Sequence, residues 1–323
     1  MNVDFLILRE EFRRVLLKVG FEEARAELCA RIFAENSRDG VHTHGLNRFP
    51  SFVRAVQDGL VVPSAEPERL TAMAALENWE GNLAPGIYNA IHCMDRAIEL
   101  AGEYGIGCVS IRNTNHWMRG GTYGWQAAEA GYLGICFTNT IANVTPWGGS
   151  EPRLGNNPMV IAVPRAEGHI VLDMAISQYS FGKMQEYKFR NEALPFAGGY
   201  DAEGNLSQDP GKIIASQRAL PIGYWKGSGL SMLIDILLTS LSGGRTTADI
   251  TKGGAESGVS QCFIAIKPGS GNEALIEQII EFTKSGHQDA VRYPGESTLA
   301  KRNTHLKEGI PVNEKIWNDV LNM

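Results

Sequence analysis

The segment Ile111–Asn139, IRNTNHWMRGGTYGWQAAEAGYLGICFTN, places one histidine between two apolar runs. The runs 107–111 and 133–138 are short, apolar and partly β-branched, which is typical of strands buried on both faces. Between them, 123–129 has the length and alanine content of a helix. The segment therefore predicts a strand, a loop, a helix and a strand in succession. In open α/β sheets ligands bind outside the carboxyl ends of the strands, so we expect chemistry at the loop that carries His116.

The rest of the chain separates into a helical part and an α/β part. Helical spacing of apolar residues predicts helices over 5–19, over 22–38 and around Phe52–Val56, before any strand. From Gly107 onward strand and helix signals alternate, which is the pattern of an α/β domain. Further helices are expected over 87–104, 182–190, 227–241 and 274–284, further strands over 159–163, 170–172 and 262–266, a long loop over 194–208, and a polar tail from Arg292.

The length of 323 residues suggests about two domains. We expect an N-terminal helical part over 1–75 that packs with 290–323, and an α/β part over 76–289. The net charge of -6 comes without a basic block, which argues against nucleic acid as a partner. No apolar run reaches the roughly 18 residues of a membrane span. We therefore expect a cytoplasmic protein without a membrane partner.

The five cysteines stand singly, in apolar contexts and without a CxxC spacing. An odd number at such distances is poor evidence for a disulfide or zinc framework. We expect all five to be reduced and buried as small apolar side chains.

Three of the seven histidines, His42, His44 and His116, stand where they could exchange a proton with a ligand. His44 lies in the motif THGLNRFP, and Arg48 follows four residues later. If a helix begins near His44, this spacing places an imidazole beside a guanidinium that can bind a carboxylate in two places. The alternative is that His44 caps a helix and Arg48 is solvated. His116 follows a buried strand, among glycines. His92 lies within a predicted helix, whereas His169, His287 and His305 stand in polar, surface-like contexts, so we assign no proton-transfer role to these four.

Neither a metal site nor the common dinucleotide fingerprint is evident. His42 and His44 are two residues apart, so in a helix or a strand they point in different directions, and no third ligand stands at a diagnostic spacing. A strand, GxGxxG and helix in succession is missing. The segment GYWKGSGL at 223–230 begins a predicted helix, where Lys226 and the glycine N–H groups could hold an anion.

Taken together, these motifs resemble the second type of malate/L-lactate dehydrogenase family. The similarity lies in THGLNRFP, in the segment around His116, in PWGG at 146–149, in GNNP at 155–158 and in GYWKGSGL, and it extends to SQCFIAIKP. The resemblance implies an α/β, non-Rossmann NAD(P)-binding fold, with a mixed sheet flanked by helices and an N-terminal helical layer. It also implies reduction of a 2-oxo acid by NADH, or by NADPH, in a homodimer whose site lies near the subunit interface.

The same resemblance implies roles for individual residues. His44 matches the family's proton donor, and His116 matches a histidine that is catalytic in some relatives. Asp173 is expected to orient an imidazole or to contact the cofactor. From the chemistry of the residues themselves, we expect Arg48 to bind the substrate carboxylate, and His116, Asn115 and Arg119 to bind other substrate atoms. The residues expected to hold the cofactor are His169, Ile170, Val171, Leu172, Asp173, Met174, Ala175, Trp225, Lys226, Gly295 and Glu296.

Two departures from the family pattern accompany these matches. Thr43 stands where the family often has serine, which keeps a hydroxyl group at that place. The region of Gly295 and Glu296 differs in length and sequence, which concerns the adenosine side of the cofactor.

A polar site of this kind suits a hydroxylated 2-oxo sugar acid, because buried donors that a smaller substrate leaves unpaired cost affinity. The resemblance implies that this acid is 2,3-diketo-L-gulonate, which NADH would reduce to 3-dehydro-L-gulonate. A malate- or L-lactate-type 2-hydroxyacid dehydrogenase is the alternative within the family. Two other classes stay open: a metal-dependent sugar-acid lyase or hydrolase that uses His42, His44 and His116, and a noncatalytic sugar-acid sensor.

Overall fold

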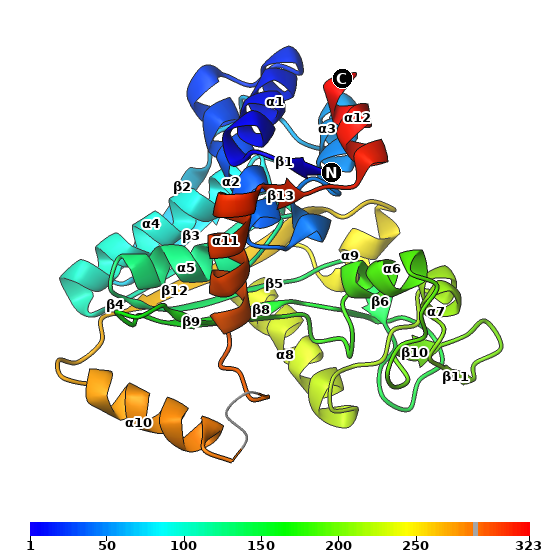
Figure 1. Cartoon of the computed structure of the whole chain (residues 1–323). Helices are drawn as coiled ribbons and strands as arrows, with labels where there is room; N and C mark the ends of the chain where they lie inside the picture. Colours follow the sequence, from blue (N-terminus) through cyan, green and yellow to red (C-terminus); the bar gives the residue numbers. More distant parts are fainter. Residues whose placement is uncertain (287–289) are drawn as a thin grey trace.

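A mixed seven-stranded sheet forms the centre of the computed structural model, which describes residues 1–286 and 290–323 (Figure 1). The strands lie in the order β2 (Glu68–Met73), β3 (Leu76–Glu80), β4 (Ile106–Asn115), β12 (Ser257–Ile266), β5 (Leu133–Thr138), β8 (Met159–Val163) and β9 (Ile170–Met174). Only β3 and β4 are parallel neighbours, and every other adjacent pair is antiparallel. The predicted mixed sheet is confirmed.

The two strands of the segment that carries His116 are not neighbours. β12 lies between β4 and β5 and pairs antiparallel with both, so β4 and β5 run in the same direction one strand apart. The helix between them, α5 (Gly121–Glu129), packs on β5 and β8. The predicted order of strand, loop, helix and strand is confirmed, and the loop after β4 lies at the end of the sheet.

Helices cover both faces of the sheet. α4 (Gly86–Tyr104) and α5 pack on one face, and α8 (Trp225–Ser242) crosses the other (Figure 1). Gly107 on β4 allows α4 to lie close, because a Cβ at this position would collide with the carbonyl oxygen of Ala97. Buried alanines and aromatic rings fill the space between α4, α5 and the sheet.

A layer of N-terminal helices lies beyond one end of the sheet. α1 (Phe5–Lys18), α2 (Glu23–Arg38) and α3 (Phe49–Gln57) pack around the fully buried rings of Phe12, Phe33 and Phe49. The ring centroids of Phe12 and Phe49 are 4.3 Å apart. Apolar residues spaced at helical intervals on each segment produce this core, and the helices expected over 5–19 and 22–38 are confirmed.

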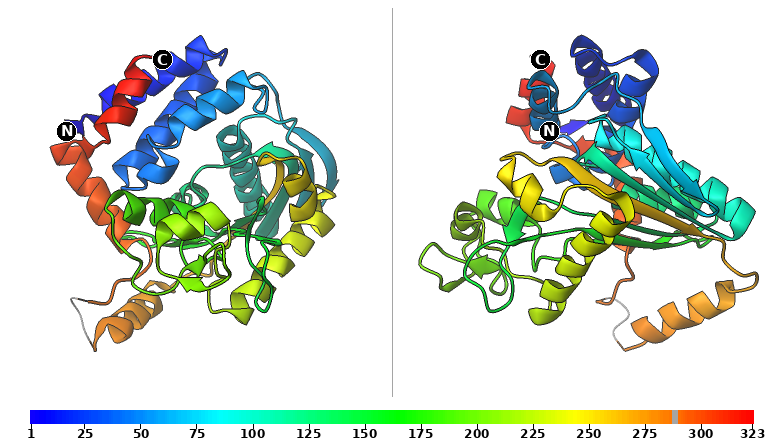
Figure 2. Two further views of the ribbon diagram at one scale, coloured as in Figure 1. Left: turned by 90° about the vertical axis from the view of Figure 1, so that its right-hand side faces the viewer. Right: turned by 180° about the vertical axis from the view of Figure 1, so that it is seen from behind.

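The C-terminal segment joins this layer, and the two ends of the chain lie on the same side of the molecule (Figure 2). β1 (Asn2–Val3) pairs antiparallel with β13 (Ile310–Pro311), and α12 (Glu314–Leu321) packs on α1 and α3. The tail from Arg292 is therefore not only polar chain, because it also contains α11 (Glu296–Glu308). The division into two domains stays a prediction, because its expected boundary at residue 289 lies outside the described residues. The expected surface position of His287 also lies outside them.

The prediction that one helix carries both His44 and Arg48 is wrong. His42–His44 form one 3-10 turn that ends at Gly45, and α3 begins only at Phe49 with Pro50 in its first turn. Proline is tolerated there because the first N–H groups of a helix have no partner within it. A bend in the chain, and not one face of a helix, therefore brings the imidazole of His44 and the guanidinium of Arg48 into the same region.

The remaining elements are short. They are β6 (Ala142–Val144), β7 (Leu154–Gly155), α6 (Phe181–Phe189), β10 (Gly199–Tyr200), β11 (Leu206–Ser207), α7 (Pro210–Ser216), α9 (Thr247–Lys252) and α10 (Glu273–Lys284). The loop expected over 194–208 thus contains the hairpin of β10 and β11. Cys29, Cys93, Cys136 and Cys262 are buried free thiols, and Cys108 is a half-buried one. Over the described ranges, none of the helices is both long and apolar enough for a membrane span.

The packing of α12 makes a prediction about stability. Trp317 is 4% exposed, and its removal leaves a cavity between α12 and the N-terminal helices. Trp317→Ala should lower the free energy of unfolding by about 3–5 kcal/mol in urea titrations. Leu306→Ala, at a position that is 53% exposed on α11, should change it by less than about 0.5 kcal/mol. An equally small change at Trp317 would show that α12 does not stabilise this layer.

Candidate active site

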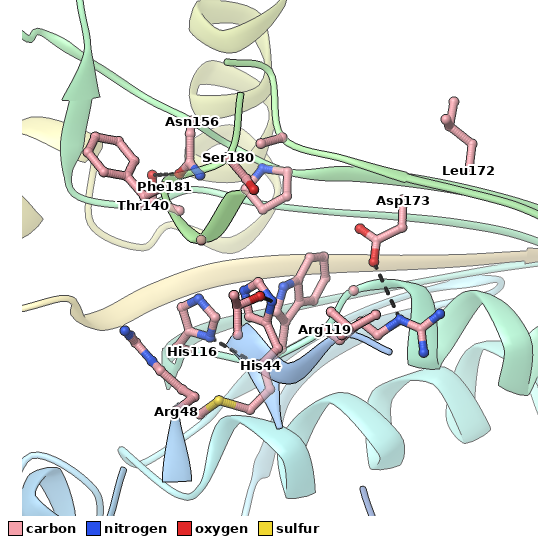
Figure 3. Close-up of a pocket in the computed structure, with 18 of the residues that line it drawn as sticks. His44, Arg48, His116, Arg119, Thr140, Asn156, Leu172, Asp173, Ser180 and Phe181 are labelled. Carbon is pink, nitrogen blue, oxygen red and sulfur yellow. Dashed lines mark hydrogen bonds and ion pairs between the residues drawn. The ribbon is translucent and has the colours of Figure 1, made fainter. Parts of the chain in front are cut away.

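A cavity of about 600 Å³ lies where the N-terminal helices meet the end of the sheet. Its walls come from His44 and Arg48, from the loop 116–120 after β4, from four of the residues 171–175 at the end of β9, and from the start of α6. In Figure 3, Arg48, His116 and His44 lie at one end, whereas Asp173 and Leu172 lie at the other. The elements that line it come from the helical layer, the sheet and the C-terminal segment.

The two candidate proton donors lie side by side. The rings of His44 and His116 are stacked, with centroids 5.7 Å apart and an angle of 14° between the planes. Nδ1 of His116 accepts the backbone N–H of Met118 at 2.9 Å. Because a protonated imidazole has no acceptor nitrogen, protonation of His116 would break this bond. Neutral His116 therefore carries its hydrogen on Nε2.

His44 is free of this restriction. Its Nδ1 lies 3.2 Å from Oγ1 of Thr43, and a hydroxyl group can donate to a neutral ring or accept from a charged one. His44 can therefore gain or lose a proton without losing this contact. Of the two histidines, it is the one whose surroundings allow proton transfer.

Burial and nearby cations keep both rings neutral in the empty cavity. Burial, with added repulsion from Arg48 and Arg119, lowers the pKa of His44 from 6.5 to about 4. Burial and Arg48 also hold the pKa of His116 well below its ordinary value. A bound anion near Arg48 would oppose part of this effect, because it offsets a positive charge that disfavours the imidazolium.

The two arginines of the cavity differ in their partners. Arg48 is exposed, and within residues 1–286 and 290–323 it forms no ion pair. Arg119 is 6% exposed, and its Nη1 donates to Oδ2 of Asp39 at 2.7 Å. The guanidinium of Arg119 is therefore already bound in the wall, whereas that of Arg48 is available for a substrate carboxylate.

The carboxylate of Asp39 connects three segments of the chain next to the cavity. This carboxylate is 2% exposed and accepts hydrogen bonds from Arg38, Arg119 and Arg302. Its pKa falls to about 2: burial opposes this shift, but the hydrogen bond from Arg302 and the charges of the three arginines outweigh it. Arg302 belongs to α11, and its guanidinium also lies 4.4 Å from the ring of Trp125. α2, the loop before α5 and α11 are thus held together behind the cavity.

Asp173 faces the cavity from the end of β9. Its Oδ2 accepts the backbone N–H of Gly121 at 2.8 Å and lies 3.9 Å from Nε of Arg119. Burial raises its pKa, and Arg119 and the N–H of Gly121 oppose that shift. These contacts are not with an imidazole, and a contact of Asp173 with the cofactor stays a prediction.

The expected cofactor residues are divided between the cavity and other places. Val171, Leu172, Asp173, Ala175 and Gly295 line the cavity, whereas His169, Ile170, Met174, Trp225, Lys226 and Glu296 do not. His169 packs against Trp125, and Glu296 binds Lys284. Roles of these outlying residues in cofactor binding stay predictions.

Asn115 is also turned away from the cavity. Its amide group donates to the carbonyl oxygens of Leu83 and Ala84, and its Oδ1 accepts from the hydroxyl of Ser257. The side chain is 4% exposed. Asn115 therefore supports the loop that carries His116, and the expected direct substrate contact is not what this arrangement offers.

The edge of the sheet fits a nicotinamide dinucleotide. β9 is an edge strand, so it presents backbone N–H and C=O groups to a ligand. Gly295 has a φ of 97°, and a Cβ there would lie 3.1 Å from the carbonyl oxygen of His169 and from N of Val171. Glycine thus lets segment 294–295 pack against β9, where the N–H of Val171 donates to the carbonyl oxygen of Pro294 at 2.9 Å, and the nearby start of α6 adds N–H groups that favour a phosphate.

Sequence reasoning missed several residues of the cavity. Thr140, Asn156, Ser180 and Phe181 form the wall opposite the histidines (Figure 3), and Glu256 lies beside His116. Asn156 belongs to the GNNP motif, which was a usable signal. Glu256 had none, because only the pairing of β12 with β4 brings it to this place.

The structure does not assemble the histidines of the metal alternative. His42 does not line the cavity, and its ring lies 6.1 Å from that of His305. Among the residues that the structure describes, no group of three or more His, Cys, Asp and Glu side chains could hold a metal ion.

Comparison with known proteins identifies the family. Residues 3–321 match the family model described as malate/L-lactate dehydrogenase. The chain belongs to this family. It is an oxidoreductase that acts on 2-oxo or 2-hydroxy acids with a nicotinamide cofactor, as the motifs around His44 and His116 predict.

The relatives include reductases of sugar acids. The enzyme is 43% identical to the 2,3-diketo-L-gulonate reductase of Citrobacter koseri, with 98% of each chain covered. It is 42% identical to the protein of that name from Escherichia coli O6:K15:H31, again over 98% of each chain.

Solved structures share the fold. The malate dehydrogenase of Entamoeba histolytica has a TM-score of 0.92 at 25% identity, covering 100% of this chain and 96% of the other. The Δ1-piperideine-2-carboxylate reductase of Pseudomonas syringae has a TM-score of 0.90 at 26% identity, covering 100% and 99%.

The protonation of His44 can be measured by NMR titration of its imidazole. We expect a midpoint at about pH 4, and a higher one in Arg48→Met, because a repelling cation is removed. Since the folded pKa lies below the ordinary 6.5, the unfolded chain binds this proton first, and His44 makes the fold less stable as pH falls from 6.5 to about 4.

Arg54→Met provides the control, because Arg54 is exposed on α3, the helix that follows Arg48, and does not line the cavity. It should leave the midpoint of His44 unchanged. A midpoint near 6.5 in the wild type would contradict the electrostatic environment described for the cavity.

Proposed function

We propose that this enzyme uses NADH to reduce a hydroxylated 2-oxo acid, 2,3-diketo-L-gulonate, to 3-dehydro-L-gulonate. The observation that carries the proposal is the arrangement of one cavity, with Arg48, His44 and His116 at one end and the edge of β9 at the other. The identity of 43% to 2,3-diketo-L-gulonate reductase supports the choice of substrate. A malate- or L-lactate-type reaction is the alternative within the family.

The side chains at the first end have separate tasks. Arg48 binds the substrate carboxylate and fixes the adjacent carbonyl group, which lowers the entropic part of the barrier. The cofactor, when bound along β9 and Gly295, supplies the hydride. The carbonyl oxygen then needs a proton, which His44 donates. His116 stays neutral and offers Nε2–H as a hydrogen-bond donor.

Substrate binding prepares His44 for this task. Its pKa is about 4, so at neutral pH the ring lacks the second proton that an imidazolium would donate. The carboxylate of the substrate offsets Arg48 and raises that pKa. In the opposite direction the neutral ring is ready to accept a proton from a hydroxy acid.

The first test is His44→Ala. Turnover should fall by about 10²–10⁴-fold, because a positioned acid contributes that much, while NADH still binds. The absorbance of NADH measures turnover with 2,3-diketo-L-gulonate, and fluorescence titration measures the binding of NADH. Near-normal turnover would transfer the role of proton donor to His116.

The second test is Arg48→Met. Loss of a charge-assisted hydrogen bond should raise the KM for the 2-oxo acid by about 10–100-fold, with a smaller effect on kcat. Arg54→Met is the matched control and should retain the wild-type KM. An unchanged KM in Arg48→Met would contradict the assignment of the carboxylate site. Parallel assays with pyruvate, oxaloacetate and NADPH compare the alternatives.

We also propose that the enzyme is a homodimer. α8 buries one face on the sheet and exposes Met232, Leu233, Ile236 and Leu237 on the other, each about half exposed. Four large apolar side chains exposed together on one helix face indicate a protein interface. Two identical chains can bury such a face against each other by two-fold symmetry. The cytoplasmic location expected from the sequence stays a prediction.

Sedimentation tests the dimer. Leu233→Asp places a charge on this face of α8 and should shift the protein from dimer to monomer at micromolar concentration. Leu206→Asp is the control, since Leu206 is 61% exposed on the hairpin of β10 and β11. A monomeric wild type would contradict the proposal.

A further inference from the structure

Glu256 enters the cavity through the register of two distant strands. β12 pairs with β4 so that Ser257 stands opposite Asn115. The residues next to this pair, Glu256 and His116, are therefore brought together at the end of the sheet. Oε1 of Glu256 lies 3.6 Å from Nε2 of His116, and both residues line the cavity.

The pair has unused hydrogen-bonding capacity. Nδ1 of His116 is occupied by the N–H of Met118, so Nε2 carries the hydrogen and faces Glu256. A separation of 3.6 Å exceeds a good hydrogen bond, so the donor and the acceptor are not satisfied by each other. Burial raises the pKa of Glu256, while Arg48 and the N–H of Ile141 oppose that shift and favour the carboxylate.

A hydroxyl group suits this arrangement. An oxygen atom about 2.8 Å from both Nε2 and Oε1 completes a triangle, accepting from His116 and donating to Glu256. A methyl group at this place leaves both partners unpaired, which costs affinity. A second carboxylate in the substrate is repelled by Glu256.

We propose that Glu256, together with His116, selects 2-oxo acids that carry a hydroxyl group beyond the carbonyl carbon. The inference rests on the proposed function, since it concerns the same cavity and places the substrate carboxylate at Arg48. It makes Glu256 a substrate-binding residue that favours hydroxylated acids over pyruvate and disfavours oxaloacetate.

Hydroxypyruvate and pyruvate test the proposal, because they differ by one hydroxyl group. In Glu256→Leu, kcat/KM for hydroxypyruvate should fall by about 10–100-fold, the effect of a lost hydrogen bond to a charged group. The value for pyruvate should change less than about threefold. Equal losses with both substrates, or no loss with either, would overturn the proposal.

Glu256→Gln tests the charge separately and keeps the size of the side chain. It should raise kcat/KM for oxaloacetate at least several-fold relative to that for pyruvate, because repulsion of the second carboxylate is removed. An unchanged ratio would overturn this part of the proposal. Glu99→Gln, on the exposed side of α4, is the control and should leave all ratios as in the wild type.

Binding measurements separate this proposal from the proposed reaction. Calorimetry of the wild type with NAD and either L-glycerate or L-lactate compares ligands that differ by one hydroxyl group and requires no turnover. Tighter binding of L-glycerate in the wild type, lost in Glu256→Leu, supports the role of Glu256 even if diketogulonate is not reduced. Equal affinities in the wild type would overturn it, even if reduction occurs.

Discussion

The cavity depends on the buried carboxylate of Asp39 and its three arginines. Arg38 lies at the end of α2, Arg119 lies in the loop before α5, and Arg302 lies on α11. A buried charge is tolerated only when it is paired, and removal of one partner leaves the others uncompensated. The helical layer, the sheet and the C-terminal segment are therefore fixed relative to one another at the place where they enclose a ligand.

This network also determines which charges a ligand meets. Arg119 is bound to Asp39 within the wall, so Arg48 is the guanidinium that is left without an ion pair among the described residues of the cavity. The same charge suppresses protonation of both neighbouring histidines. A negative charge beside Arg48 would therefore raise the pKa of His44, which is the basis of the proton donation proposed for it.

Local pattern predicted much of the fold. Helical periodicity located α1, α2, α4 and α8, and the apolar runs located β4 and β5. The bend between His44 and Arg48 was not predicted, because spacing alone does not show that one turn ends at Gly45 before α3 begins at Phe49. Both side chains nevertheless reach the cavity.

Long-range pairing explains the residues that the sequence did not reveal. The insertion of β12 between β4 and β5 has no local signal, and it alone places Glu256 at His116. Asp39 follows an amphipathic helix, where a single acid looks like a solvated helix end, and its partner Arg302 stands near the other end of the chain. Asn115 shows the reverse case, since a motif residue beside His116 serves the backbone of a neighbouring loop.

The relation between His44, the substrate and the cofactor is the centre of this account. A crystal structure of the enzyme with NAD and a bound 2-hydroxy acid measures it directly. The account predicts the carboxylate on Arg48, the hydroxyl oxygen within hydrogen-bond distance of His44, and the nicotinamide on the opposite face of the reacting carbon, next to β9. A dinucleotide bound outside this cavity, or a hydroxyl oxygen out of reach of His44, would contradict it.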